Sequence, residues 1–382
     1  MTRIGVGLST SSSSSDAGVE AAREARAGLE DAPVDLAFAF LSPAHVDGAA
    51  QVAEAIRSEL RPNRLLGCVA EGVVARGREL EDGPGVAVWA GSLPGAEIET
   101  FHAVAAVNDE DISLTGIPDF DEPTLVALLV DPFTFPTGAF IDYVNETYPG
   151  LPLVGGIAAG GRAPGTQALI HDAEIYDEGA LGVVVSGVPI RTVVSQGCAP
   201  IGRDAVITQA DGNVVFELAG KPALERLREE IAALPREQQA LAAQGLLAGL
   251  VIDENKPEYG PGDFLIRGLL GADEESGALA VGEAARVGQT LRFHVRDAAT
   301  AEEDLRTALA EALEAETPAG ALLFTCNGRG TRMFPAPDHD AKALAEALGS
   351  PALAGFFCGG EIGPVGGRAF LHGFTATMAV FL

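Results

Sequence analysis

Hydrophobic and polar positions along the chain follow one plan three times. In each repeat an apolar strand is followed by a polar turn, an amphipathic helix, a second apolar strand and a glycine-rich turn. The helices are predicted at about 47–60, 137–148 and 340–348. The strands that flank these helices are predicted at 36–43 and 65–72, at 125–132 and 153–161, and at 321–330 and 353–363.

The three repeats also share the position of one glycine. Gly67, Gly155 and Gly355 stand at similar distances after the polar turns of their repeats, and further strand-like runs follow each glycine turn. A supersecondary unit that recurs in one order predicts related regions whose sheets pack together. We therefore predict an α/β (α+β) fold with mixed or antiparallel sheets, in two related regions packed as one body.

The N-terminus carries a run of serines between a predicted strand at 3–8 and a predicted helix at about 17–29. Asp16 is the residue type that caps a helix N-terminus, and we expect it to do so here. A bare serine run is typical of a flexible linker, which is the interpretation we favour for Ser9–Ser15. Its hydroxyl and amide groups could instead contact a ligand.

A different segment separates the second repeat from the third. It contains a predicted helix at 221–234, predicted strands, and an amphipathic helix at 302–315. The strands are predicted at 245–253, 263–273 and 285–297. We place a domain boundary near Gly220, which divides the chain into regions 1–220 and 221–382.

The chain is strongly acidic, with a formal net charge of −29 over 382 residues and 54 acidic against 25 basic side chains. Nucleic acids and anionic membranes are recognised by clustered lysine and arginine, so we exclude nucleic acid as the main partner, and the same charge disfavours an anionic membrane surface. The content of 47% apolar residues is ample for a folded core. No segment predicts a signal peptide or a membrane span, and we expect a cytoplasmic protein.

The motifs that would indicate a cofactor are missing from the sequence. The four cysteines, Cys68, Cys198, Cys326 and Cys358, have no CxxC spacing, and the histidines have no metal-ligand spacing. No glycine-rich segment matches the phosphate-binding patterns of nucleotide sites. We therefore predict no cofactor and no metal.

With these motifs in hand, the chain resembles the FIST family of sensory proteins, which have a FIST-N and a FIST-C region. The resemblance rests on VDLAFAFLSPAH, LLGCVAEGVV and LPLVGGIAAGG in region 1–220, and on LLFTCNGRGTRMF and AGFFCGGEIGPV in region 221–382. It implies an intracellular sensor of small molecules such as amino acids, with no established catalytic residues. No signalling module is fused to these motifs, so a separate signalling protein is the expected partner.

The segment FTCNGRGTRMF offers the first candidate ligand site. Glycines on both sides of Arg329 let the backbone approach a ligand, and the planar guanidinium suits a carboxylate. Arg332 has the same chemistry. The second strand of this repeat ends with Cys358 and Glu361 among glycines, and the equivalent turns of the other repeats carry Glu71 and Arg162.

We hypothesise that Arg329 and Glu361 face one pocket and hold the carboxylate and the amino group of an amino-acid-like ligand. In the alternative, Arg329 pairs with one of the many acids, and Glu361 caps a turn or pairs with Arg329. The candidate ligand-binding residues are Cys326, Asn327, Arg329, Arg332, Phe357, Cys358 and Glu361.

The preferred function is thus a cytoplasmic sensor that binds a small molecule and signals through a separate protein. One alternative is a protein-interaction scaffold without a small ligand. Another is an enzyme in which Cys326 or Cys358 is the nucleophile and His339 or His372 is the base. Because no catalytic motif is present, we expect that the protein is not an enzyme.

Overall fold

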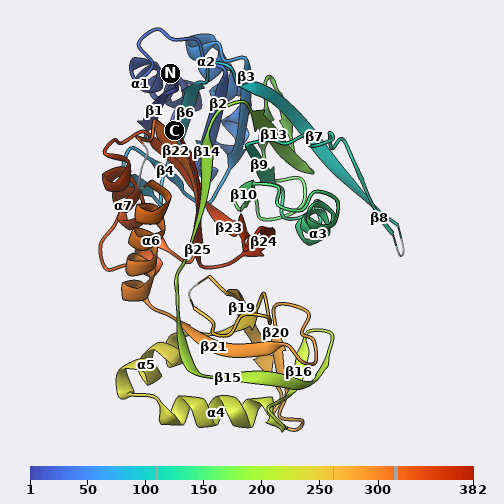
Figure 1. Ribbon diagram of the computed structural model, residues 1–382. Coiled ribbons are helices and arrows are strands. Elements are labelled where there is room, and N and C mark those ends of the chain that lie inside the picture. Colours follow the sequence, from blue (N-terminus) through green and yellow to red (C-terminus); the bar gives the residue numbers. More distant parts are fainter. Residues whose placement is uncertain (109–110, 261, 314–316) are drawn as a thin grey trace. The chain divides into compact units, whose positions relative to one another are not determined.

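The computed structural model describes residues 1–108, 111–260, 262–313 and 317–382 and divides into two compact units (Figure 1). Unit 1 comprises Met1–Val194, Leu305–Leu371 and Thr375–Leu382. Unit 2 comprises Ser195–Asp304 and His372–Phe374. The boundaries of these units differ from a division near Gly220, because the chain leaves unit 1 and later returns to it. As predicted, the fold is α/β with mixed sheets.

Each predicted repeat forms a strand–helix–strand unit in unit 1, and its two strands pair in parallel. The first repeat is β2 (Leu36–Leu41), α2 (Ala49–Leu60) and β3 (Arg64–Val69); the second is β9 (Leu125–Val130), α3 (Thr137–Thr147) and β10 (Leu153–Ala158); the third is β22 (Gly320–Cys326), α7 (His339–Leu348) and β23 (Leu353–Val365). An antiparallel strand lies beside the first strand of each pair, namely β6 (Val86–Ser92), β13 (Ala180–Ser186) or β25 (Thr375–Phe381).

The shared glycine has the same role in all three repeats. Gly67, Gly155 and Gly355 each lie on the second strand, opposite a residue of the first strand in the parallel register. A Cβ atom on these glycines would lie 2.3, 2.0 and 1.7 Å from the carbonyl oxygens of Ala39, Leu128 and Leu323, respectively. Any side chain there would push the paired strands apart. The recurring glycine therefore follows from the closeness of the two strands.

The described residues of unit 1 form two sheets. The first has the order β1–β6–β2–β3–β11–β12, with β1 at Arg3–Ser9, β11 at Leu169–His171 and β12 at Glu174–Tyr176. The second has the order β14–β25–β22–β23–β10–β9–β13–β7–β8, in which antiparallel pairing of β10 with β23 joins the second and third repeats. Its remaining strands are β14 (Ile190–Gln196), β7 (Glu97–Asn108), β8 (Asp111–Thr115), β4 (Val73–Ala75), β5 (Arg78–Leu80) and β24 (Arg368–His372).

Aromatic side chains fill the space between these two sheets. The Phe40 ring of the first sheet lies 5.2 Å from that of Phe356 in the second, and Trp89 lies 4.8 Å from Phe381. Helices cover the outer faces: α1 (Ser14–Ala27) and α2 pack on the first sheet, and α3 and α7 pack on the second. Burial of this apolar surface is the main favourable contribution to folding of unit 1.

The linker interpretation of the serine run is wrong. Ser9 is the last residue of β1, Ser14 and Ser15 belong to α1, and Ser13 is the N-cap residue. The Ser13 side chain accepts a hydrogen bond from the backbone N–H of Asp16, so Asp16 is not the cap. Serine is as good a cap as aspartate, and position relative to the first helical turn decides between them.

Unit 2 is an antiparallel sheet with helices on one face. Its strands have the order β15–β21–β18–β19–β20–β16–β17, and α4 (Ala223–Ala233) and α5 (Arg236–Gln244) pack on them. The strands are β15 (Cys198–Asp211), β16 (Val214–Leu218), β17 (Lys221–Pro222), β18 (Leu246–Val251), β19 (Phe264–Ala272), β20 (Leu279–Val281) and β21 (Thr290–Arg296). Helix α6 (Ala298–Leu313) follows β21. The sequence prediction missed α5 and the long strand β15.

No helix in the described part of the chain combines the length and the apolar content that a membrane crossing requires.

Substitution of Gly355 by alanine should strongly destabilise unit 1, by several kcal/mol, because the new methyl group meets the Leu323 carbonyl group. The matched control is Gly138→Ala in α3, where nothing lies within 4 Å of the new Cβ atom. That change should not destabilise the protein, because alanine is the better helix former. Urea unfolding, followed by the fluorescence of Trp89, measures both effects. Equal stability of the two variants would contradict the proposed role of the glycine.

Candidate functional site

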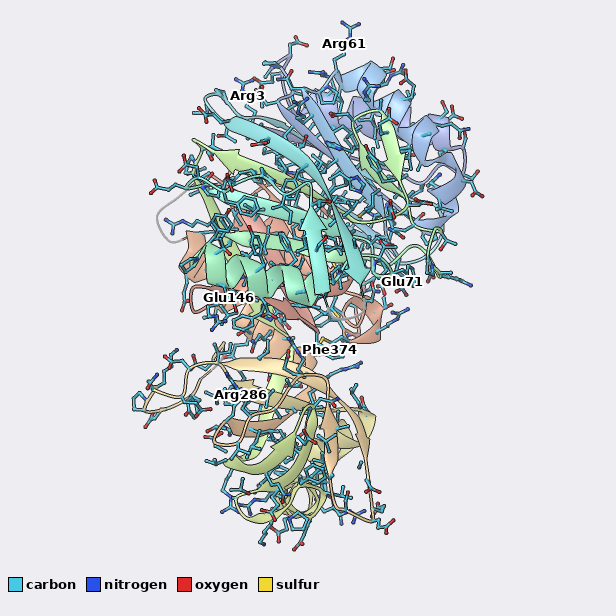
Figure 2. All side chains as sticks on the ribbon, turned by 90° about the vertical axis from the view of Figure 1, so that its right-hand side faces the viewer. Arg3, Arg61, Glu71, Glu146, Arg286 and Phe374 are labelled. Atoms are coloured by element: carbon cyan, nitrogen blue, oxygen red, sulfur yellow. The ribbon has the colours of Figure 1, made fainter. Side chains whose placement is uncertain are left out.

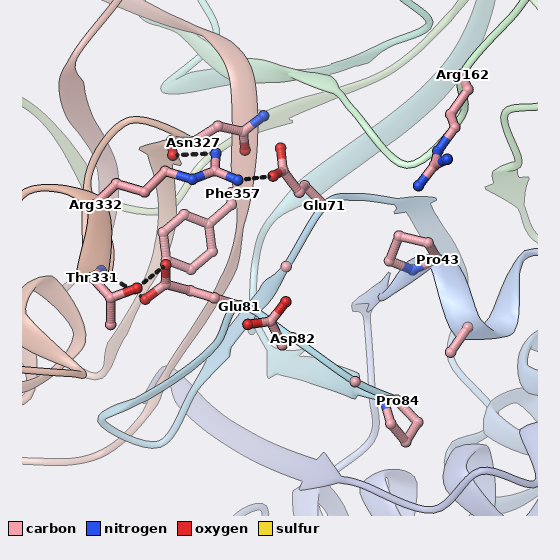
Figure 3. Close-up of a pocket in the computed structure, with 13 residues that line it drawn as sticks. Pro43, Glu71, Glu81, Asp82, Pro84, Arg162, Asn327, Thr331, Arg332 and Phe357 are labelled. Carbon is pink, nitrogen blue, oxygen red and sulfur yellow. Dashed lines mark hydrogen bonds and ion pairs between the residues drawn. The ribbon is translucent and has the colours of Figure 1, made fainter.

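A pocket of about 440 Å³ lies in unit 1, where turns from all three repeats meet (Figure 3). Most of its residues follow the carboxyl ends of strands, which is where open α/β sheets usually bind ligands. The first repeat and the loop between β5 and β6 contribute Pro43, Ala44, Glu71, Gly72, Glu81, Asp82, Gly83 and Pro84; the second contributes Arg162; the third contributes Asn327, Thr331, Arg332 and Phe357.

A buried ion pair anchors the loop that follows β22 in the third repeat to helix α7. The side chain of Arg329 is inaccessible to solvent, and its Nε and Nη2 donate to the carboxylate of Asp340 at 2.6 and 2.8 Å. Thr325 Oγ1 also donates to this carboxylate. Burial alone would raise the pKa of Asp340, but the guanidinium of Arg329 outweighs burial and holds that pKa well below its usual range. Arg329 is therefore already paired inside the protein.

Backbone contacts complete the loop. The N–H of Arg329 donates to the carbonyl oxygen of Cys326, and that of Asn327 to the carbonyl oxygen of Cys358, each at 2.9 Å. Gly330 has a φ of +58°, a conformation that favours glycine. A Cβ atom there would also lie 2.7 Å from the carboxylate of Glu81. This geometry places Asn327, Thr331 and Arg332 at the pocket.

Glu361 is also fully buried and has an internal partner. Its Oε2 accepts hydrogen bonds from the N–H of Thr375 at 3.2 Å and from its hydroxyl at 2.8 Å. Burial raises the pKa of Glu361 to about 8.

The structure thus separates the sequence candidates into two groups. Asn327, Arg332 and Phe357 line the pocket, whereas Arg329, Glu361, Cys326 and Cys358 do not. Arg329 and Glu361 lie inside the protein because each has a polar partner there, Asp340 and Thr375. The pairing of Arg329 with an acid was the open alternative to ligand binding.

Contacts across the pocket tie the third repeat to the first. Arg332 donates from Nη2 to Glu71 at 2.5 Å and from Nη1 to the carbonyl oxygen of Asn327 at 2.9 Å. The carboxylate of Glu81 accepts from the N–H and the hydroxyl of Thr331, both at 2.8 Å. Figure 3 shows these two contacts beside the ring of Phe357.

Two charged groups of opposite sign remain available at the pocket. The side chains of Arg162 and Asp82 are exposed and have no hydrogen-bond or ion-pair partner among residues 1–108, 111–260, 262–313 and 317–382. Figure 3 shows Arg162 entering from the side opposite Glu81 and Asp82. In addition, Oδ1 of Asn327 is buried and accepts no hydrogen bond from the described residues. The pocket can therefore offer both signs of charge to a ligand.

The acidic loop was missed by the sequence analysis. Glu81 and Asp82 stand in no motif, and their only signal is the turn sequence Gly83-Pro84-Gly85 after a run of acids. Glu71 and Arg162 were visible as equivalents in the repeat pattern, but nothing in the sequence distinguished them from other turn residues.

Comparisons with known proteins cover the whole chain. The FIST N domain model matches residues 35–221 and the FIST C domain model matches residues 223–364. The uncharacterized proteins Rv0628c of Mycobacterium tuberculosis and Mb0898c of Mycobacterium bovis are each 46% identical over 385 residues. These alignments cover 100% of this chain and 100% and 99% of the two relatives.

One solved structure, the crystal structure of cyanuic acid hydrolase from A. caulinodans, aligns over 100% of both chains at 12% identity. Its TM-score of 0.31 is too low to support a conclusion about this chain.

Substitution of Asp340 by asparagine should destabilise unit 1 by about 3–5 kcal/mol, because it leaves the buried guanidinium of Arg329 without a counter-charge. The control is Glu59→Gln, which breaks the exposed pair with Arg23 and should cost less than about 1 kcal/mol. Urea unfolding monitored through Trp89 compares the two. If Asp340→Asn loses no more unfolding free energy than Glu59→Gln does, the ion pair of Arg329 with Asp340 does not anchor the loop.

The raised pKa of Glu361 predicts a specific pH dependence of stability. Between its ordinary pKa of 4.5 and its folded pKa of about 8, the folded protein holds a proton that the unfolded chain has released. The contribution of Glu361 is therefore fully present below pH 4.5 and is lost as the pH rises to 8, with a slope of up to about 1.4 kcal/mol per pH unit.

Glu361→Gln cannot release this proton, so its stability should decline less than that of the wild type between pH 5 and 8. Urea midpoints at several pH values measure the difference, with Glu59→Gln as the control that keeps the wild-type slope. Parallel pH profiles of Glu361→Gln and the wild type would show that Glu361 ionises normally in the folded protein.

Proposed function

Because the chain belongs to the FIST family, whose domains are sensory and signal-transduction domains, we propose that it binds a small amino-acid-like ligand in the pocket between its three repeats. Binding would be the input of a signal. The observation that carries this proposal is that Arg162 and Asp82, two oppositely charged side chains without a partner among the described residues, line one cavity of about 440 Å³. This volume lies in the usual range of small-molecule sites.

The chemistry of the two side chains matches the two ends of a zwitterion. The planar guanidinium of Arg162 suits a carboxylate, because its N–H groups can donate two parallel hydrogen bonds. The carboxylate of Asp82 accepts hydrogen bonds from an ammonium group. Phe357, Pro43 and Pro84 supply apolar surface for the rest of the ligand. In this proposal Arg162 and Asp82 take the roles that the sequence hypothesis gave to Arg329 and Glu361.

The contacts across the pocket suggest how binding is transmitted. The ion pair of Arg332 with Glu71 and the hydrogen bonds of Thr331 with Glu81 connect loops of different repeats beside the ligand site. A ligand that interacts differently with two arrangements of these loops shifts the balance between them. We propose that a separate signalling protein in the cytoplasm recognises the ligand-bound arrangement.

We propose binding without cysteine chemistry. Cys326 and Cys358 are buried, and neither lines the pocket. Burial raises the pKa of the Cys358 thiol well above its ordinary value, which keeps it in the protonated, weakly nucleophilic form. These facts disfavour the thiol-enzyme alternative.

Isothermal titration with a panel of amino acids tests the proposal. The wild type should bind at least one of them, and Arg162→Gln should weaken that binding by about tenfold or more, because it removes a charge-assisted contact to the carboxylate. The matched control is Arg61→Gln. Arg61 is another exposed arginine of unit 1, and Figure 2 shows it far from Glu71.

Arg61→Gln should bind like the wild type. If the wild type binds no amino acid at millimolar concentration, the amino-acid proposal fails and the scaffold alternative gains support. If Arg61→Gln weakens binding as much as Arg162→Gln does, the effect comes from net charge and not from the pocket.

A further inference from the structure

The charges around the pocket do not balance. Three carboxylates line it, those of Glu71, Glu81 and Asp82, against the two guanidinium groups of Arg162 and Arg332. The excess of negative charge lies within one cavity, together with Arg162, which has no partner in the described part of the chain and would hold the ligand carboxylate. The excess of carboxylates indicates that the ligand carries more positive than negative charge.

The internal contacts show where the excess lies. Arg332 is paired with Glu71, so these two charges offset each other. The donors to Glu81 are the N–H and hydroxyl groups of Thr331, which are neutral and place no cation opposite this carboxylate. Asp82 has no partner among the described residues. Two neighbouring carboxylates, Glu81 and Asp82, therefore face the pocket without a cationic partner from residues 1–108, 111–260, 262–313 and 317–382.

A neutral amino acid cannot offset both of these carboxylates. It brings one ammonium group and one carboxylate, and the carboxylate is taken by Arg162 in the arrangement proposed above. One negative charge then remains uncompensated beside the bound ligand. A ligand with two cationic groups and one carboxylate brings the pocket to neutrality, and like-charged carboxylates that share a site are stabilised by such a cation.

We propose that the pocket selects a basic amino acid, a ligand with a second ammonium or guanidinium group on its side chain. This inference rests on the proposed function, because it uses the same pocket and the same role of Arg162. The α-carboxylate lies at Arg162, and the α-ammonium and the side-chain cation share the neighbouring carboxylates of Asp82 and Glu81 on the opposite side of the pocket (Figure 3). The aliphatic stem between them runs past the apolar surface of Phe357 and Pro84.

The negative electrostatic field of the whole protein also favours a cationic ligand. The chain carries a formal net charge of −29, and clefts of one sign concentrate ligands of the opposite sign. The general field attracts any cation, whereas the carboxylate end requires Arg162. Asp82 is therefore the specificity-determining residue that we assign, since its loss should weaken ligands with a side-chain cation more than ligands with an α-ammonium group alone.

Three related probes separate the contributions of the two ends of the ligand. Lysine has both groups, norleucine lacks the side-chain ammonium, and cadaverine lacks the carboxylate. In isothermal titrations of the wild type, lysine should bind about tenfold or more tightly than either norleucine or cadaverine, which corresponds to one charge-assisted contact at each end.

Two variants assign these contacts to residues. Asp82→Asn should reduce the affinity for lysine about tenfold and that for norleucine by less, because the single ammonium group of norleucine can pair with Glu81 instead. The matched control Asp142→Asn removes the same charge from an exposed position on α3 and should bind all three probes like the wild type. Arg162→Gln should weaken the binding of lysine and norleucine but not that of cadaverine, which has no carboxylate. Circular dichroism and the urea midpoint verify that each variant is folded.

The outcomes distinguish this inference from the proposed function. Equal binding of norleucine and lysine, or tighter binding of glutamate than of lysine, overturns the selection of basic ligands and leaves the amino-acid proposal standing. An equal loss of lysine affinity in Asp142→Asn also overturns it, because the effect would then come from net charge. Absence of binding by every amino acid overturns the proposed function itself, as does binding of cadaverine as tightly as lysine.

Discussion

The ion pair between Arg329 and Asp340 is the interaction on which the pocket depends. Both side chains are removed from water, and their two hydrogen bonds compensate charges that would be costly to bury alone. The pair joins the turn after β22 to the first residues of α7. Because this turn carries Asn327, Thr331 and Arg332, the buried pair determines where the third repeat meets the pocket. Arg329 acts as a positioning residue, because its guanidinium is buried against Asp340 and does not line the pocket.

The repeated architecture explains why three distant turns form one site. In each repeat two parallel strands lie so close that only glycine is accommodated at Gly67, Gly155 or Gly355. Parallel pairing directs the carboxyl ends of both strands to the same edge of the sheet. The turns that leave these edges come from sequence positions as far apart as Pro43 and Arg332, and they line one cavity. The paired strands thus fix the positions of the turns, and the side chains on these turns form the binding surface.

Pairing within the protein decides which of the charges can act on a ligand. Arg329, Arg332 and Arg162 have the same side chain, yet the first is buried against Asp340, the second is paired with Glu71, and the third has no partner among the described residues. The same distinction applies to the acids, where Glu361 is enclosed and Asp82 is exposed. A charged group that is already paired and desolvated has little free energy to offer a ligand, whereas an exposed unpaired group retains it.

The sequence alone determined the three strand–helix–strand repeats, the α/β class and the family, because apolar periodicity and glycine spacing are local properties of the chain. It also identified Asn327, Arg332 and Phe357, which line the pocket. Only the tertiary structure decided that Arg329 and Glu361 are internal, that Glu81 contacts Thr331 from 250 residues away along the chain, and that Ser13 of the serine run caps a helix. The reason is physical: burial and charge pairing depend on neighbours in space, and these neighbours are far apart along the chain.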